Sequence, residues 1–174
     1  MLTKEQEKWI EHLSDTDKIE IVLFDPHSQA EFEGIKSLIQ SKLGSTVRVE
    51  HHGASSMGIS GQNEIDIYVP VPASLFDSFI NKMTEIFGEP HRIYPLERAR
   101  FNAGDDKKKI DVHLVNEEHD NWRNSEKFET YLKTHPEALE QYRILRENGD
   151  GLTIREYYRQ KVEFINDILA KISN

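Results

Sequence analysis

Acidic and imidazole side chains interrupt two otherwise apolar segments of the chain, residues 64–71 and 109–115. Apolar and polar residues alternate along both segments, and this alternation predicts strands whose successive side chains point to opposite faces. One face is aliphatic, and the other carries the groups that can bind a metal, which are Glu64, Asp66, Asp111 and His113. If the two strands are neighbours in one sheet, these four side chains converge.

Carboxylates grouped in this way suit Mg²⁺, which prefers oxygen ligands and is usually held by one or two carboxylates together with substrate phosphates. Such ions stabilise the entering and leaving oxygens in phosphoryl or nucleotidyl transfer. A sheet with one solvated face shows the same alternation without any function, so a purely structural explanation stays open. For His113 three roles stay open: metal ligand, proton shuttle, or structural hydrogen-bond partner of Asp66.

A loop rich in small residues precedes the first of these segments. It begins Gly53-Ala54-Ser55-Ser56 and contains two further glycines, Gly58 and Gly61. Small residues let a backbone approach a ligand, and successive backbone N–H groups can cradle a phosphate. A helix that begins after Gly53 would add its positive end. No Gly-Lys-Ser/Thr follows, so the loop is not a P-loop, and glycine-rich loops without function are common.

Two pairs of polar residues flank these segments. His51 and His52 are adjacent on a predicted strand and face opposite ways, so at most one of them enters the site, and for His51 we expect a structural hydrogen bond. Arg98 and Arg100 alternate on the strand before 109–115 and face the same way. They can meet a phosphate or a carboxylate in a bidentate manner, or form ordinary surface ion pairs.

The composition excludes several kinds of site. The chain has no cysteine, which rules out disulfides, thiolate zinc sites and a cysteine nucleophile. Its formal net charge of −9 disfavours binding to nucleic acid through charge. The basic run Lys107-Lys108-Lys109 follows Gly104-Asp105-Asp106, and we interpret it as a solvated hairpin tip. Charged residues near the N-terminus and the lack of an apolar run of about 20 residues predict a cytoplasmic protein without membrane segments.

Periodicity predicts an α+β domain over residues 1–174, with a sheet-containing core over about 18–116 and helices over about 117–174. The predicted strands are 18–24, 46–51, 64–71, 98–102 and 109–115. The predicted helices are 3–14, 28–43, 73–87, 120–133, one from Pro136, and a last one capped by Thr153 with Glu156. We interpret the aromatic residues at helical spacing as interhelical core rather than a base-stacking platform: Trp122, Phe128, Tyr131, Tyr157, Tyr158 and Phe164.

The stretch from Val49 to Ile67 resembles the signature of the GrpB family, roughly Glu-His-x-Gly-Ser-Thr-x-x-Pro-Gly followed by Lys-Pro-x-Ile-Asp-Ile. Three further pieces resemble family segments in the same order: Phe24-Asp25-Pro26, residues 128–136 (FETYLKTHP) and residues 155–165 (REYYRQKVEFI). The resemblance implies a nucleotidyltransferase-like fold with a mixed sheet flanked by helices. In that superfamily a Gly-Ser turn binds nucleotide and three acids hold metal. Here Gly53 with Ser55 or Ser56 matches the turn, Asp66 the first acid and Asp111 the third.

The sequence departs from that pattern at several positions. Ala54 follows the glycine where serine is usual, Gln62-Asn63 replaces Lys-Pro, and Tyr68 occupies the position of the second acid. Glu64, on the same strand face, is a candidate substitute. The resemblance therefore implies two functions. One is Mg²⁺-dependent binding of a nucleoside triphosphate with nucleotidyl transfer to an unknown acceptor. The alternative is a catalytically inactive module on the same fold that binds a ligand or an unidentified protein partner.

Overall fold

A computed structural model describes residues 1–105 and 108–173 of the chain. The described residues form two compact units. The sheet unit consists of Phe24–Ile59 and Asn63–Ser125, and the helical unit consists of Met1–Leu23, Ser60–Gln62 and the described residues from Glu126 on. The elements in chain order are α1 Lys4–Glu11, α2 Ser28–Leu43, β1 Glu50–His52, α3 Gly53–Ser56, β2 Glu64–Val71, the 3₁₀ turn η1 Ala73–Leu75, α4 Phe76–Phe87, β3 Arg92–Tyr94, β4 Arg98–Asn102, β5 Lys109–Asn116, α5 Asp120–Thr134, α6 Pro136–Asn148 and α7 Ile154–Ser173.

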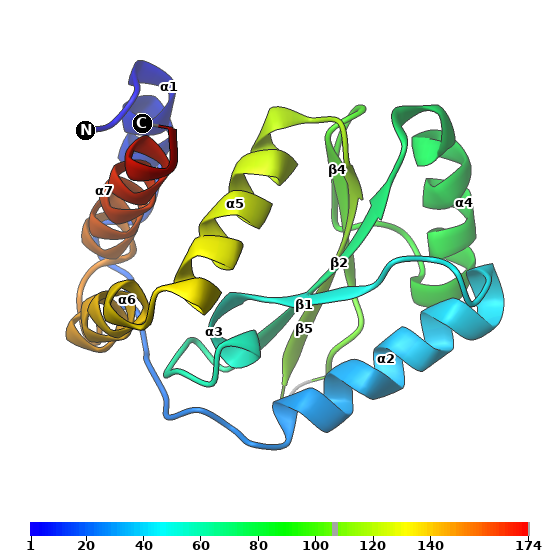
Figure 1. Cartoon of the computed structure of the whole chain (residues 1–174), viewed down its shortest axis with the longest axis horizontal. Helices are drawn as coiled ribbons and strands as arrows, with labels where there is room; N and C mark the ends of the chain where they lie inside the picture. Colours follow the sequence, from blue (N-terminus) through cyan, green and yellow to red (C-terminus); the bar gives the residue numbers. More distant parts are fainter. Residues whose placement is uncertain (106–107, 174) are drawn as a thin grey trace. The chain divides into compact units, whose positions relative to one another are not determined.

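Among the described residues the sheet unit contains one five-stranded sheet in the order β1-β2-β5-β4-β3 (Figure 1). The central strands β2 and β5 run parallel, and the other pairs are antiparallel. A parallel pair needs a long crossover, and here the chain between β2 and β5 contains α4 and the β3–β4 hairpin. The predicted α+β class with a mixed sheet and helices is therefore confirmed.

The core of the sheet unit lies between the sheet and two helices, α2 and α4 (Figure 1). On β2 and β5 the inward side chains are the aliphatic ones predicted from the alternation, and they meet Phe76 and Met83 of α4. Those inward residues are Ile65, Ile67, Val69, Ile110, Val112 and Leu114. Burial of each such side chain contributes roughly 1.5–3 kcal/mol, so this face holds β2 and β5 in place.

The helical unit is built from α1, α6, α7 and the residues of α5 from Glu126 on. Two of the predicted interhelical aromatics, Phe128 and Phe164, pack there together with Tyr142, because Phe128 lies 5.4 Å from Tyr142 and 6.3 Å from Phe164 between ring centroids. The predicted capping box at the start of α7 is present: the Thr153 N–H donates to Glu156 Oε2 at 3.0 Å, and the Glu156 N–H donates to Thr153 Oγ1 at 3.1 Å. Within residues 1–105 and 108–173, no helix has the length and apolar character required to cross a membrane.

The predicted strand 18–24 is wrong. This segment is β-prone in composition, but it makes only two isolated bridges, from Lys18 to Thr153 and from Val22 to Gly61. Its backbone instead bonds to a side chain far away in the sequence, since the Ile21 N–H donates to Asp150 Oδ1 at 2.9 Å. The predicted strand 46–51 is shorter in the structure, as β1, and the predicted loop 53–61 begins with the short helix α3. The edge strand β3 was not predicted, because three residues are too short to show alternation.

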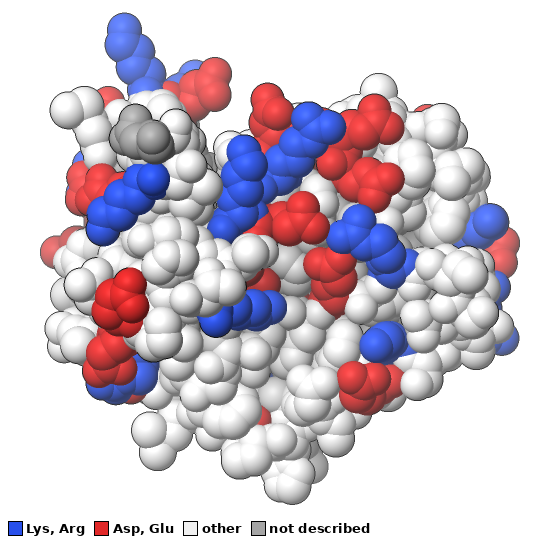
Figure 2. Space-filling view, in the orientation of Figure 1, with Lys and Arg blue, Asp and Glu red and all other residues white. Residues whose placement is uncertain are grey.

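The β4–β5 hairpin was predicted, and its antiparallel pairing is confirmed. Residues 106 and 107 of its predicted tip lie outside the described residues. The solvated-turn interpretation is wrong for Lys108, whose side chain is 12% exposed and whose Nζ donates to Asp25 Oδ2 at 2.9 Å. Elsewhere, basic and acidic side chains are interspersed on the face drawn in Figure 2.

Candidate functional site

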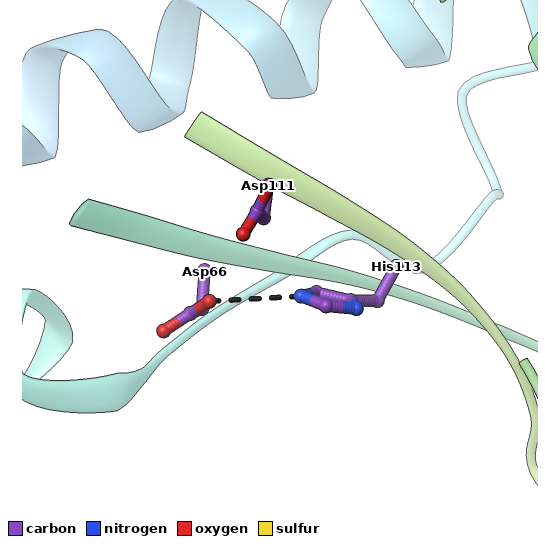
Figure 3. Close-up of side chains that lie close together, drawn as sticks. All are labelled: Asp66, Asp111 and His113. Carbon is purple, nitrogen blue, oxygen red and sulfur yellow. Dashed lines mark ion pairs between the residues drawn. The ribbon is translucent and has the colours of Figure 1, made fainter. Parts of the chain in front are cut away.

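The parallel pairing of β2 with β5 brings three of the predicted metal-binding residues together. In this register Asp66 is the partner of Asp111, and Tyr68 is the partner of His113, so all four side chains share one face of the sheet. One ligand atom from each of Asp66, Asp111 and His113 lies within 4.8 Å of the others (Figure 3). His113 Nε2 is 3.6 Å from Asp66 Oδ1. We call these three residues the acidic cluster.

Two cations flank the Asp111 carboxylate. Asp111 is only 5% exposed, and a buried carboxylate needs compensating charge or hydrogen bonds. Lys109 Nζ lies 3.3 Å from its Oδ2, and Arg100 Nε lies 3.5 Å from its Oδ1. These neighbours on β4 and β5 place positive charge beside the Asp111 carboxylate, and they reduce the net negative charge that a metal ion would meet.

Glu64, the fourth predicted ligand, is placed apart from the acidic cluster. Its register partner is Lys109, and the Lys109 Nζ donates to Glu64 Oε2 at 2.5 Å. Burial disfavours the charge of Lys109, but the carboxylates of Glu64 and Asp111 outweigh that effect and raise its pKa above the ordinary value. Sequence reasoning placed Lys109 on the hairpin tip and missed this role. The signal that pointed to it is the alternation itself, which puts 109 and 111 on one face.

The glycine of the predicted turn lies against Asp66. Gly53 has φ +77°, and a Cβ built there would stand 2.7 Å from Asp66 Oδ2. A side chain at residue 53 would therefore displace the carboxylate, and the positive φ also favours glycine. The two serine hydroxyls of the turn make local contacts. Ser55 Oγ is 2.9 Å from His51 Nε2, and the Ser56 hydroxyl donates to the Gly53 carbonyl at 2.9 Å.

The two adjacent histidines face opposite ways, as predicted. His51 stacks on Phe32, with 4.8 Å between ring centroids, and its hydrogen bond to Ser55 is the structural kind expected for it. His52 is the register partner of Asp66 and lies on the polar face. Its Nε2 is 3.0 Å from Glu50 Oε2, and this hydrogen bond, with a smaller contribution from Arg48, holds the pKa of Glu50 below its ordinary value.

An aromatic stack borders the acidic cluster at the position where the resemblance implies a second acid. The Tyr68 ring lies 4.6 Å from His113 at an angle of 17°, and 5.3 Å from Trp122. Trp122 also lies 5.2 Å from His52. The prediction that Trp122 belongs to an interhelical core is wrong, because the first turn of α5 packs its indole on the sheet. Helical spacing marks an apolar face but does not say what that face contacts.

The donor atoms of the acidic cluster decide whether it suits a divalent cation. Its donors are two carboxylates and one imidazole, a set that suits Mn²⁺ as well as Mg²⁺. His113 is 7% exposed, and its Nδ1 is buried without a hydrogen-bond partner among the described residues. The other ring nitrogen, Nε2, faces Asp66 (Figure 3), so it is the nitrogen placed to ligate a cation in the cluster. The residues therefore fit a divalent cation bound by Asp66, Asp111 and His113.

A family model and a solved structure are similar to this chain over most of its length. The family model described as GrpB protein matches residues 18–171. The crystal structure of the conserved protein GrpB from Enterococcus faecalis is 20% identical, has a TM-score of 0.67, and is matched over 88% of this chain and 99% of that chain. A MgGTP-bound structure of the Cid1 poly(U) polymerase is 10% identical, with a TM-score of 0.49 over 78% of this chain and 43% of that chain. A comparison with curated proteins gives no match. Because the family match spans most of its length, the chain belongs to the GrpB family.

Proposed function

We propose that this chain binds a nucleoside triphosphate together with a divalent cation on the polar face of its sheet, and transfers the nucleotidyl group to an acceptor. One observation carries the proposal: ligand atoms of Asp66, Asp111 and His113 lie within 4.8 Å of one another on two paired strands. Side chains on paired strands are fixed by the aliphatic core beneath them, so the ligand positions are preorganised. This arrangement supports cation-dependent phosphate chemistry at the site.

Each residue has a stated role in this proposal. Asp66 and Asp111 hold the cation, and His113 is either a third ligand or the group that takes the acceptor proton. When bound, the cation supplies the charge that neutralises phosphate oxygens. The backbone of Gly53, Ser55 and Ser56 receives the phosphates, because the bare Gly53 backbone lies directly beside Asp66. The position of His113 Nε2, 3.6 Å from Asp66 Oδ1, supports its part.

Isothermal titration with ATP, GTP and CTP, with and without Mg²⁺ or Mn²⁺, tests the proposal. Micromolar binding should require the cation, and Asp66→Asn should weaken it at least tenfold. Asp77→Asn, on the exposed side of α4, is the matched control and should bind like the wild type. Wild-type affinity in Asp66→Asn, with an unchanged thermal transition, would count decisively against the proposal.

A second candidate function is a catalytically inactive binding module, and one observation favours it. Lys109 and Arg100 already lie within 3.5 Å of Asp111, and Tyr68 stands where a second acid would hold another cation. Charge count sets the affinity for hard cations, so these replacements lower it. Release of pyrophosphate from a nucleoside triphosphate by the wild type, and its loss in Asp111→Asn, would exclude the inactive module.

The acceptor in this proposal is a small molecule rather than a nucleic acid. The formal net charge is −9, and polymers of phosphate are bound mainly through Lys and Arg. Salt-sensitive retardation of RNA by the protein would overturn this choice of acceptor. A cytoplasmic location is proposed as well, because a chain without cysteine suits a reducing compartment.

A further inference from the structure

A small pocket opens beside the acidic cluster within the sheet unit. Its volume is about 190 Å³. It is lined by Tyr68, Glu97, Arg98, Val115, Asn121, Trp122 and Ser125, and we call it the hairpin pocket. Sites for drug-sized ligands usually have roughly 300–1,000 Å³, so this pocket holds one functional group of a ligand rather than a complete nucleotide. Tyr68 connects it to the cluster, because the same ring stacks on His113.

The walls of the pocket offer polar groups rather than a free aromatic face. The Tyr68 ring is already stacked on His113 and packed on Trp122, so a planar base has no open Tyr68 face to stack on. The remaining hydrogen-bond donors belong to Arg98, Asn121 and Ser125, and Glu97 is the one carboxylate in the lining. A guanidinium has five N–H donors and no acceptor, and an amide and a hydroxyl add donors that can rotate toward a ligand. Such a set recognises oxygen acceptors.

The neighbourhood of Arg98 is positively charged. The antiparallel register pairs Arg92 with Arg100 and Tyr94 with Arg98, which puts the three arginines on the face that carries Asp111. Arg92 donates to the Tyr94 hydroxyl at 3.3 Å, and the Arg98 guanidinium lies 4.7 Å from the Tyr94 ring centroid. The hydrogen bond from Arg92, and then the one from Arg98, lowers the pKa of the Tyr94 hydroxyl, as expected where positive charge gathers.

One carboxylate lies among these arginines, and it acts as a support for the pocket. Glu97 Oε1 accepts a hydrogen bond from Asn121 Nδ2 at 2.9 Å, and it is 3.7 Å from Arg98 Nε. The second distance exceeds a hydrogen bond, so this pair leaves the Arg98 donors able to bond elsewhere. Glu97 thus orients Asn121 and places negative charge near Arg98 without a hydrogen bond to the guanidinium.

The backbone that carries Glu97 and Arg98 is held in a strained turn. Leu96 has φ +54°, a conformation that a leucine rarely adopts. Buried Asn116 fastens the turn, because its Nδ2 donates to the Leu96 carbonyl at 2.9 Å and its backbone N–H donates to the Glu97 carbonyl at 2.9 Å. Strained backbone persists where the surroundings over-determine it, and it gathers at ligand-binding positions. The turn therefore presents Arg98 to the pocket on a rigid frame.

We propose that the hairpin pocket binds an oxyanion, a carboxylate or a phosphate, carried by the acceptor substrate, with Arg98 as its principal ligand and Asn121 and Ser125 as further donors. The assignment to the acceptor rests on the proposed nucleotidyl transfer. It follows from the place of the pocket: Tyr68 separates it from the cation-binding residues, and its size excludes a complete nucleotide. The acceptor group that receives the nucleotide then points from the pocket toward His113.

Two-dimensional ¹H–¹⁵N NMR of the full chain provides the test, because the chain has two tryptophans. Trp122 lines the pocket, and Trp9 on α1 of the helical unit is an internal reference. Inorganic phosphate and acetate are titrated separately at constant ionic strength. At least one should shift the Trp122 indole signal saturably and leave Trp9 in place, and the tighter of the two identifies the oxyanion class.

Arg98→Gln should weaken this binding at least fivefold. Arg123→Gln is the control. Arg123 is exposed and follows Trp122 on α5, and this variant should bind the anion like the wild type. Equal affinity in Arg98→Gln, or no saturable shift of Trp122 with either anion, would overturn the proposal. Arg98→Lys keeps the charge but loses the planar fork, and we expect intermediate affinity.

A separate arm distinguishes failure of this inference from failure of the proposed function. With Mg²⁺ and ATP at saturation, the anion should still bind at Trp122; displacement by ATP would make the pocket part of the nucleotide site and overturn the acceptor assignment. Asp66→Asn should lose nucleotide and keep the anion. In a further outcome, the wild type binds no nucleotide while its Trp122 shift still depends on Arg98. That result would support the oxyanion pocket, and it would contradict both the proposed function and the assignment of the pocket to an acceptor.

Discussion

The two faces of the sheet are made by the same strands, but their composition and surroundings are opposite. On β2, Ile65 and Ile67 are fully buried under α2 and α4, whereas Asp66 and Tyr68 between and beside them are partly exposed on the other face. On β5 the aliphatic side chains alternate with Asp111 and His113, and there both of these polar residues are buried. Adjacent residues therefore serve different purposes: one face stabilises the strands, and the other positions polar groups on the frame that results.

The largest expected effect is a loss of stability on substitution of a residue on the core face. Ile67→Ala removes a fully buried side chain and should destabilise the protein by about 2–5 kcal/mol, because a cavity remains. Asp66→Asn, one residue away, should change stability by less than about 1 kcal/mol. Urea denaturation of both variants measures the difference. Equal destabilisation would mean that the polar face also carries the fold.

Gly53→Ala should have the next largest effect, and it should also disturb the acidic cluster on the polar face. The residue needs positive φ, which costs a non-glycine residue about 1–2 kcal/mol, and its Cβ would stand 2.7 Å from Asp66 Oδ2. Gly58→Ala is the control, since Gly58 has φ +69° but no atom within 4 Å of a Cβ. We expect both variants to lose stability and Gly53→Ala alone to lose Mn²⁺ affinity. Equal Mn²⁺ affinities of the two variants would show that Gly53 is not part of the cation site.

Lys109→Gln should sharpen the contrast by raising the negative charge of the polar face. Lys109 Nζ lies 3.3 Å from Asp111 Oδ2, and a unit charge at about 4 Å contributes roughly 1 kcal/mol in a watery environment. Mn²⁺ should therefore bind about fivefold more tightly to the variant. Lys42→Gln, exposed on α2, is the control. Weaker Mn²⁺ binding to Lys109→Gln would show that Lys109 holds the cluster in shape instead.

The smallest expected effect depends on pH. His52 and then Arg48 lower the folded-state pKa of Glu50, so the unfolded chain binds its proton more tightly and the ionised form stabilises the fold. This stabilisation, under about 1 kcal/mol, is present above the ordinary pKa of 4.5 and is lost as pH falls through the lower folded value. The gap in thermal midpoint between wild type and Glu50→Gln should be constant near neutral pH and shrink below pH 4.5. A gap that is unchanged in acid would exclude this account of Glu50.

Local pattern predicted the elements that form the site, and long-range pairing completed it. The alternation over 64–71 and 109–115 predicted β2, β5 and the face that each side chain takes, and the spacing over 28–43 predicted α2. The parallel pairing of β2 with β5 could only be stated as a condition, because it depends on a crossover of more than thirty residues. That pairing decides which acids meet, and it leaves Glu64 with Lys109.

The residues that sequence reasoning missed act through tertiary contact. Trp122 has the spacing of a core residue, and nothing local shows that it packs on Tyr68. The segment 18–24 has the composition of a strand, but pairing requires a partner and its neighbours are the bridges at Thr153 and Gly61. The β3–β4 turn, with its strained Leu96, carries no turn signal beyond one proline. Contacts between distant residues are what local propensity omits.

The central claim is that the polar face of the sheet binds a divalent cation at Asp66, Asp111 and His113. Anomalous diffraction from crystals grown with Mn²⁺ tests it most directly. The account predicts an anomalous peak about 2.1 Å from an oxygen of each aspartate, with an imidazole nitrogen of His113 as neighbour or ligand. Crystals with Mn²⁺ bound elsewhere or not at all, and with Lys109 and Arg100 still beside Asp111, would contradict it.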